Sequence, residues 1–292
     1  NAAADDWPAF RHDNARSAVS GESLAPPISL EWVFTAAHPP EPAWPEEGKE
    51  KNRVRFDEAY HVAVAGDKVF FGSSADNKVY CLDAATGQVR WTFFTGGPVR
   101  VAPTVYEDLV YAGSDDGCAY CLRADDGALV WKVRPSFRDE RVLGNGKMIS
   151  LWPVRTGVVV HKGANDPAPI AYFAAGVFPN ESLFLCAVKA DDGTVLWFND
   201  SYGEDGYKLE YGGISPQGPM LVSENSLFVP SGRAMPAVFT RDRGRFQYYA
   251  PARGKNGGTW ALLTEDRLVA GLYGKKAYVQ ENGGIVPDAA YA

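Results

Sequence analysis

A short pattern that recurs along this 292-residue chain constrains its fold more than any other feature. In three segments, a small residue is followed by glycine six positions later and by tryptophan ten positions later. The segments begin at Cys81, Cys121 and Ala187, and their tryptophans are Trp91, Trp131 and Trp197. A repeat at a fixed period is typical of proteins built by stacking one structural unit many times.

Two further observations extend the repeat. A degenerate fourth copy runs from Val238 through Gly244 to Tyr248, where tyrosine takes the place of tryptophan. A second pattern, in which Gly, Asp or Asn precedes an apolar run, occurs at four places: 66–72, 107–113, 224–230 and 265–271. The first two of these lie 41 positions apart, and so do the last two. The repeat therefore covers most of the chain.

Each unit is typical of four short strands. In the first unit we expect strands at about 61–65, 68–73, 78–83 and 88–94, which are rich in β-branched and aromatic residues. Asp67, Asn77 and Gly87 fall between them, where the chain must reverse tightly. A four-stranded unit repeated about every 40 residues predicts an all-β fold, a β-propeller of antiparallel blades.

Composition excludes several other classes of protein. The chain is 46% hydrophobic, which allows a large core and argues against a disordered chain. It contains no run of about 18 apolar residues, so we expect no transmembrane segment. Its formal net charge of −7 argues against nucleic acid as a partner, because nucleic-acid binders usually carry a basic field.

The four cysteines do not indicate a disulfide scaffold or a metal site. Cys118 and Cys121 form a C-x-x-C pair, but the residues between them are typical of a strand. Residues three apart on a strand face opposite sides and lie about 10 Å apart, too far for a disulfide. A zinc site of this type would need a second pair. We expect small, half-buried structural residues instead.

The repeat resembles the tryptophan-docking motif of the quinoprotein superfamily, whose propellers are built from pyrroloquinoline-quinone-like (PQQ-like) repeats. That superfamily includes quinoprotein alcohol dehydrogenases and the propeller lipoprotein of the outer-membrane β-barrel assembly machine. The segments 6–11 and 30–32 are similar to the lead-in strand of its periplasmic members. The resemblance implies that each docking aromatic packs at the outer edge of its blade against the next blade. These structural residues are Trp91, Trp131, Trp197 and Tyr248.

The number of blades raises a question about length. We expect residues 1–292 to form one propeller domain of five blades and most of a sixth, with Trp32 ending a strand of the first. The last blade is cut short near 259–292, whereas the family norm is eight blades. Either the ring is smaller, or further blades or domains of a longer polypeptide close it, and we favour the second. The proline-rich stretch 36–55 is typical of a solvated excursion.

If the family geometry holds, the first strand of each blade lines a central channel. These strands are expected near 60–64, 100–105, 150–155, 212–217 and 258–262. Their polar and aromatic side chains could grip an anionic or sugar-like ligand, since arginine presents a planar fork to carboxylates. The candidate ligand-binding residues are Arg100, Trp152, Arg155, Gln217 and Trp260. Alternatively, they satisfy buried carbonyls or pair with acids, namely Asp57, Glu58 and Glu210.

The resemblance is less informative about chemistry. A quinone dehydrogenase of this superfamily needs a tryptophan floor, a calcium or lanthanide ion held by oxygen ligands, and an aspartate base. Many of its alcohol dehydrogenases also carry an adjacent cysteine pair, which this chain lacks. Three Asp-Asp-Gly triplets look calcium-like, but they fall at hairpin turns of the repeat: 115–117, 125–127 and 191–193. We therefore assign no catalytic residue, cofactor-binding residue or metal ligand.

Two functions remain open. The first is a non-catalytic binding or assembly platform, whose partner is a protein or a small anionic or sugar-like ligand, with no cofactor. We expect it to be periplasmic or secreted, since the chain opens at Asn1 without a leader; a signal peptide has been removed or the chain is a fragment. The second is a PQQ-dependent oxidoreductase of alcohols or sugars, with PQQ and calcium as cofactors.

Overall fold

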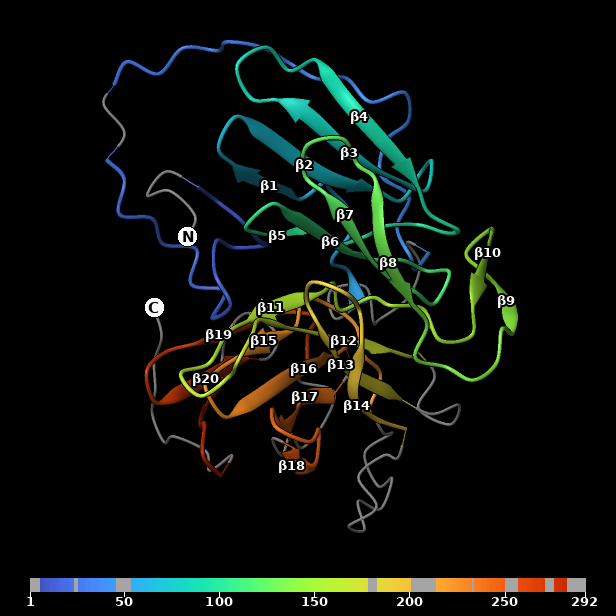
Figure 1. The fold of residues 1–292 in the computed structure, drawn as a ribbon, viewed down its shortest axis with the longest axis vertical. Helices are drawn as coiled ribbons and strands as arrows, with labels where there is room; N and C mark the ends of the chain where they lie inside the picture. The colour runs from blue at the N-terminus through green and yellow to red at the C-terminus, as the bar shows by residue number, and fades with distance from the viewer. Residues whose placement is uncertain are drawn as a thin grey trace.

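The computed structural model describes residues 6–23, 26–45, 54–177, 183–200, 214–232, 234–249, 257–270 and 276–282. The expected strand at 212–217 and the expected partner Glu210 lie partly or wholly outside these residues, as does the end of the chain from 283. The described part is all-β, and its strands form separate antiparallel sheets (Figure 1). Within it, no helix is long and apolar enough to cross a membrane.

The first two sheets have four strands each, in chain order. The first contains β1 (Val62–Ala65), β2 (Lys68–Ser73), β3 (Lys78–Asp83) and β4 (Val89–Phe94). The second contains β5 (Thr104–Tyr106), β6 (Leu109–Gly113), β7 (Ala119–Arg123) and β8 (Leu129–Val133). The sequence prediction for the first unit is therefore confirmed, with β2 and β3 at the expected bounds and β1 and β4 one residue shorter.

Two more four-stranded sheets and a three-stranded sheet follow. The third contains β11 (Val159–His161), β12 (Ile170–Ala175), β13 (Phe184–Lys189) and β14 (Val195–Asn199). The fourth contains β15 (Leu221–Val222), β16 (Ser226–Ser231), β17 (Ala234–Thr240) and β18 (Phe246–Tyr249). The fifth contains β19 (Ala261–Leu263), β20 (Arg267–Ala270) and β21 (Lys276–Val279).

A separate hairpin lies between the second and third sheets in the sequence. It consists of β9 (Arg141–Gly144) and β10 (Lys147–Ser150), which pair only with each other among the described strands. Figure 1 shows it projecting to the right of the sheets. The sequence repeat does not predict this hairpin, which lies outside it.

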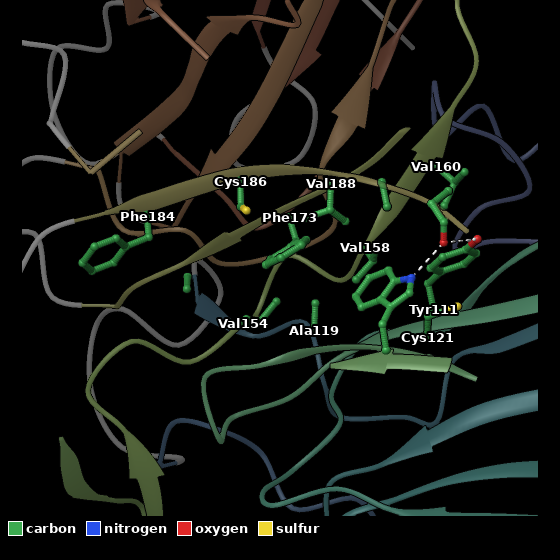
Figure 2. Packing of buried hydrophobic residues seen from close by; sticks show 14 of the residues in the cluster. Tyr111, Ala119, Cys121, Val154, Val158, Val160, Phe173, Phe184, Cys186 and Val188 are labelled. Carbon is green, nitrogen blue, oxygen red and sulfur yellow. Dashed lines mark hydrogen bonds between the residues drawn. The ribbon is translucent and has the colours of Figure 1, made fainter. Parts of the chain in front are cut away.

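The sheets pack face to face in chain order around the first strand of each. The first strands are neighbours in succession: β1 lies beside β5, β5 beside β11, β11 beside β15, and β15 beside β19. Between the first two sheets, Phe70 and Trp91 meet Val110 and Leu122 in one buried cluster. Figure 2 shows the next interface, where Tyr111 and Cys121 of the second sheet face Phe173 and Val188 of the third. This radial arrangement is that of propeller blades.

Four of the first strands begin later than the sequence analysis expected. The ladder begins at Thr104, Val159, Leu221 and Ala261 rather than at about 100, 150, 212 and 258. Proline explains two of these differences, because it has no N–H to donate to a ladder. Pro103 and Pro219 stand within two residues of the start of β5 and of β15. The segments that contain Arg100, Arg155 and Gln217 therefore precede the first strands instead of forming them.

The recurring tryptophans connect neighbouring sheets. Trp91 Nε1 donates a hydrogen bond of 3.0 Å to the carbonyl of Ala124, and Trp131 Nε1 donates one of 2.8 Å to the carbonyl of Ala190. Each acceptor is the residue that follows the third strand of the next sheet. Trp32 makes the same bond to Ala84 at 2.9 Å, although it lies outside any strand, contrary to our expectation.

The last two repeats vary this contact. The indole of Trp197 packs on Gly244, whose Cβ, if it had one, would lie 2.3 Å from ring atom Cζ3. Tyr248 donates its hydroxyl to the carbonyl of Gln280 at 2.6 Å. Gln280 follows β21 and so holds the same place as Ala124 and Ala190. The tyrosine thus reaches an equivalent carbonyl with a different polar group.

Candidate functional site

Two buried arginines share one carboxylate at the inner ends of the blades. Asp115, in the turn between β6 and β7, is fully buried and accepts two hydrogen bonds of 2.9 Å from Nε and Nη2 of Arg155. It also accepts one of 2.7 Å from Nε of Arg100. The fork of Arg155 matches both carboxylate oxygens, a geometry that stabilises a buried pair more than a single contact does. Both arginines precede first strands, which brings them to this position.

A second carboxylate completes the cluster. Asp57 is buried and precedes β1. It accepts a hydrogen bond of 2.6 Å from Nη1 of Arg100 and one of 2.8 Å from the backbone N–H of Ala43. Nη1 of Arg100 also donates a hydrogen bond of 2.7 Å to the backbone carbonyl of Glu41. The cluster therefore joins two arginines to two aspartates, and its formal charges cancel.

Gln217 joins the cluster through an indole. Trp44 Nε1 donates a hydrogen bond of 2.5 Å to Oε1 of Gln217. The centre of the Trp44 ring lies 5.8 Å from the guanidinium carbon of Arg155. The side-chain amide nitrogen of Gln217 donates a hydrogen bond of 2.8 Å to the hydroxyl of Ser215. Because the Trp44 ring faces Arg155, a flat ligand that stacked on this side of the guanidinium would have to displace Trp44.

The segment 36–55 is only in part the solvated excursion that its prolines predict: much of residues 36–45 is exposed, but the chain around Ala43 packs against the protein. Ala43 is buried, Trp44 is half-buried, and the N–H of Glu41 donates 2.8 Å to the hydroxyl of Ser74. Tryptophan among prolines was the signal for burial, because its large ring gains most when it is removed from water. Residues 46–53 of this stretch lie outside the described part.

Burial and charge act in opposite directions on these groups. Burial favours the neutral form of Asp115, but Arg155 and Arg100 outweigh it and hold the pKa of that carboxyl below its ordinary value. Burial likewise disfavours the charged form of Arg100, but Asp115 and Asp57 outweigh it and raise the arginine pKa. Asp115 and Arg100 are therefore both charged at neutral pH.

The remaining two candidates take other positions. Trp152 is 1% exposed and lies in the hydrophobic cluster between the second and third sheets, where its ring meets Phe184 edge-on at 5.7 Å. Trp260 is half-buried, with the guanidinium of Arg11 5.2 Å from its ring centroid. The structure thus gathers Arg100, Arg155 and Gln217, but not Trp152 and Trp260. The gathered groups pair internally, largely as the alternative interpretation described.

The opposite ends of the first strands meet the beginning of the chain. Trp7 pairs with Val64 of β1 through two backbone hydrogen bonds of 2.8 Å. The chain then bonds to four further inner segments, and the donor–acceptor pairs are Val105 N to Pro8 O, Asn14 Nδ2 to Val160 O, Val222 N to Asn14 O, and Leu263 N to Ala15 O. Residues 7–16 therefore run across the inner strands of all five sheets. We call them the axial segment.

One arginine anchors the axial segment inside the protein. Arg16 is 2% exposed, and its Nε donates 3.0 Å to the carbonyl of Met220. Its Nη1 donates a hydrogen bond of 3.0 Å to the carbonyl of Phe10 and one of 3.1 Å to the carbonyl of Asp13. Burial lowers the pKa of Arg16 to about 10, so it remains charged at neutral pH. The similarity of residues 6–11 to a lead-in strand gives no sign of this arginine.

The Asp-Asp-Gly triplets form turns. In the first triplet, the carboxylate of Asp116 accepts a hydrogen bond of 3.0 Å from the N–H of Cys118 and another from the hydroxyl of Tyr120. Gly117 has a φ of 86°, and a Cβ there would lie 2.7 Å from the Ser150 hydroxyl. Among the described residues, no group of three or more His, Cys, Asp or Glu side chains is placed to hold a metal ion.

Comparison with known proteins gives one family and two kinds of relative. A family model described as outer membrane protein assembly factor BamB matches residues 41–262. The chain is 25% identical over 231 residues to the quinoprotein alcohol dehydrogenase PedH of Pseudomonas putida, covering 64% of this chain and 36% of that protein. It is 24% identical over 136 residues to outer membrane protein assembly factor BamB of Yersinia pestis, covering 47% of this chain and 29% of that protein. The chain thus spans about a third of the length of these curated relatives.

Solved structures show the same fold. BamB from Moraxella catarrhalis superposes with a TM-score of 0.51 at 16% identity, covering 75% of this chain and 60% of that chain. The quinohemoprotein alcohol dehydrogenase from Comamonas testosteroni superposes with a TM-score of 0.64 at 16% identity, covering 98% of this chain and 49% of that chain. At this identity the likeness establishes the propeller fold and carries no assignment of activity.

Proposed function

Because this chain belongs to the family of the outer membrane protein assembly factor BamB, we propose that it is a non-catalytic propeller that serves as a binding or assembly platform in the periplasm. The family includes members named as assembly factors, and the chain is also similar to proteins named as dehydrogenases. The choice between these two functions rests on the site.

The pairing of the inner polar groups carries the proposal. Arg100 and Arg155, which could have bound an anion, are neutralised by Asp57 and Asp115 at hydrogen-bond distance. A ligand carboxylate would have to displace one of these buried partners and leave it without its arginine. Breaking a buried pair in this way costs about 3–5 kcal/mol. The cluster therefore favours a structural role over ligand capture.

The chain's own segments also occupy both ends of the first strands. The axial segment bonds to the inner strands at one end, and Trp44 covers Arg155 at the other. A platform of this kind would meet its partners through its outer surfaces. We propose a protein as the partner.

A PQQ-dependent oxidoreductase is the competing function. A quinone at the inner ends would meet Trp44 above Arg155, and Gln217 already accepts the Trp44 indole. A flat quinone ring that stacked on Arg155 from this side would have to displace Trp44 and break its hydrogen bond to Gln217, so these residues do not favour PQQ while Trp44 keeps its place.

Quinone uptake tests the proposal directly. Purified protein is dialysed against PQQ and calcium, and bound quinone is measured by absorbance together with dye-linked oxidation of alcohols and sugars. We expect no stoichiometric uptake and no turnover. Stoichiometric uptake with turnover would establish the oxidoreductase.

A matched variant identifies the reason for the result. Trp44→Ala uncovers Arg155 but leaves the four charged groups of the cluster in place. Uptake by Trp44→Ala and not by the wild type would support the view that Trp44 blocks the inner ends. Equal uptake by both proteins would contradict it.

A further inference from the structure

The hairpin β9–β10 projects from the sheets and has a well-defined turn (Figure 1). Asn145 and Gly146 join its strands with φ values of 46° and 85°, which define the tight two-residue turn that suits the twist of paired strands. The pairing closes at Gly144 and Lys147 and continues through Leu143 opposite Met148. The geometry of the hairpin is thus set locally.

One face of the hairpin is fixed to the body of the protein. Ile149 is 3% exposed. On the same face, Nζ of Lys147 donates hydrogen bonds of 2.7 Å to the carbonyl of Ser74 and of 2.6 Å to that of Ala75. At the turn, Nδ2 of Asn145 donates 2.7 Å to the carbonyl of Pro42. These contacts fix the orientation of the hairpin.

The other face is exposed near the turn, where it carries two apolar residues, and is buried at Ser150. Successive residues of a strand point to opposite faces, so Leu143 and Met148 lie on the face away from Ile149. They are directly opposite each other and are 73% and 55% exposed. Arg141 shares this face, two positions before Leu143, and is also exposed. A sheet face of this kind normally carries polar residues.

A third exposed apolar residue lies in the loop that leads to β9. Phe137 is 73% exposed, and its ring meets Phe198 of β14 edge-on at 5.4 Å. Phe198 is itself exposed. Phe137 and Phe198 thus form a second exposed apolar pair, on the chain that leads into the hairpin and on β14.

The charge of this region differs in sign from that of the whole chain. Residues 132–150 contain five basic and two acidic residues, a net charge of +3, in a chain of net charge −7. The basic residues are Lys132, Arg134, Arg138, Arg141 and Lys147. Asp116 lies 3.5 Å from Lys132 and Glu41 lies 2.9 Å from Lys147, so a smaller excess of positive charge remains around the hairpin. Since opposite charge steers association, this excess favours an acidic partner.

The outer edge of β9 is open for pairing. Because a two-residue turn closes at Gly144 and Lys147, the next pair, Leu143 and Met148, directs its backbone groups away from the hairpin. On the β10 side, the N–H of Ser150 donates 2.7 Å to the carbonyl of Asp115, which ties that edge to the second blade. No described strand pairs with the outer edge of β9. An extended peptide can add to an edge of this kind.

We propose that β9 and the exposed face formed by Arg141, Leu143 and Met148 bind an extended acidic segment of a partner protein, whose apolar side chains alternate with glutamate or aspartate. Main-chain pairing with β9 provides the affinity, and Leu143 and Met148 receive the apolar side chains. Arg141 meets the acidic ones. This inference rests on the proposed platform function and specifies its partner.

A synthetic peptide of alternating valine and glutamate, about ten residues long, serves as the probe. Its binding to the whole chain is measured by fluorescence anisotropy. The double variant Leu143→Lys with Met148→Lys should weaken binding by about tenfold or more, because it removes the apolar contacts. The controls Val89→Lys and Val195→Lys alter equally exposed valines on β4 and β14 and should stay within about twofold of the wild type. The absence of wild-type binding, or equal binding by the double variant, would overturn the inference.

Two further readouts separate this mode from other ones. Hydrogen exchange at the amide of Leu143 should slow when the peptide binds, since edge pairing protects an outward N–H. Peptides with lysine in place of glutamate should bind about tenfold more weakly. Binding to anionic phosphatidylglycerol vesicles instead of the peptide, or self-association abolished by the double variant, would replace the proposed partner with a membrane or a second copy.

The outcome is independent of the quinone experiment. Peptide binding that fails while PQQ uptake is absent would refute the hairpin site and leave the platform function standing. Uptake of PQQ with turnover would refute the platform function whatever the peptide does.

Discussion

The indole N–H of Trp91 in the first sheet donates a hydrogen bond of 3.0 Å to the carbonyl of Ala124, 33 residues along the chain in the second sheet. Trp91 also lies over Gly127, where a Cβ atom would come within 2.6 Å of ring atom Cε3. One side chain therefore joins two blades both by apolar contact and by a polar bond. The same relationship links Trp131 to Ala190 and Gly193.

Replacing Trp91 separates its two contributions. Trp91→Phe keeps most of the buried ring but leaves the Ala124 carbonyl without its donor, so we expect a loss of about 1–3 kcal/mol in the free energy of unfolding. Trp91→Ala also leaves a cavity and should cost about 3–5 kcal/mol. Urea unfolding measures both values. A smaller loss for Trp91→Ala than for Trp91→Phe would contradict this account.

The glycine beneath the ring gives a second test. Gly127 has a φ of 71°, so Gly127→Ala introduces backbone strain in addition to the clash with Trp91. Gly66 has a φ of 55° but nothing within 4 Å of a Cβ position, so Gly66→Ala introduces strain alone, about 1–2 kcal/mol. We expect Gly127→Ala to be the more destabilising in thermal unfolding. Equal effects would mean that the ring does not restrict this position.

The cysteines should behave as buried structural thiols. All four are free and buried, and burial raises the pKa of Cys81 and Cys118 to about 11 and that of Cys121 and Cys186 to about 12. The reactive thiolate is therefore scarce at pH 8. Labelling with a thiol reagent should be absent in the native protein and complete in urea. Fast labelling of Cys118 and Cys121 without unfolding would favour a redox role for the C-x-x-C pair.

Sequence was sufficient for the fold because the signals for the blades are local. Alternation of side chains and glycine at the turns set the bounds of β2 and β3, and both lie where the sequence predicted them. The hairpin β9–β10 was missed although Asn145-Gly146 is a strong turn signal, because it occurs once and lies outside the repeat.

The site depended on contacts between distant residues, which a single sequence does not specify. Arg100 lies 43 residues from Asp57, and Trp44 lies 173 residues from Gln217. The predicted first strands include both arginines, and Asp57 is among the acids predicted to pair with them. The sequence pattern explains Asp115 only as a turn residue, because nothing local distinguishes a turn aspartate from one that closes an ion cluster.

Breaking the ion cluster should be more destabilising than breaking a surface pair of similar geometry. Arg155→Met leaves Asp115 buried with one arginine instead of two, and we expect a loss of about 3–5 kcal/mol in the free energy of unfolding. The control is Arg123→Met, which breaks the exposed pair with Asp126 and should cost less than about 1 kcal/mol. Similar losses in urea unfolding would show that burial adds nothing to the Arg155 contact.

The pKa of Asp115 predicts how stability depends on pH. Burial raises this pKa, but Arg155 and Arg100 outweigh burial and hold it below the ordinary value. The unfolded chain therefore takes up a proton near pH 4, at a pH where the folded protein does not. The stability that the carboxylate contributes is complete above that pH and is lost as the pH falls through the folded pKa.

We expect the wild type to lose stability steeply below about pH 4 and Asp115→Asn to lose it less steeply, since the variant lacks this titration. Asp126→Asn, which removes an exposed carboxylate, should keep nearly the wild-type slope, because solvent screens its pair with Arg123. Urea unfolding at a series of pH values measures the three slopes, and an Asp115→Asn slope as steep as that of the wild type would mean that the buried carboxylate does not titrate as its two arginines require.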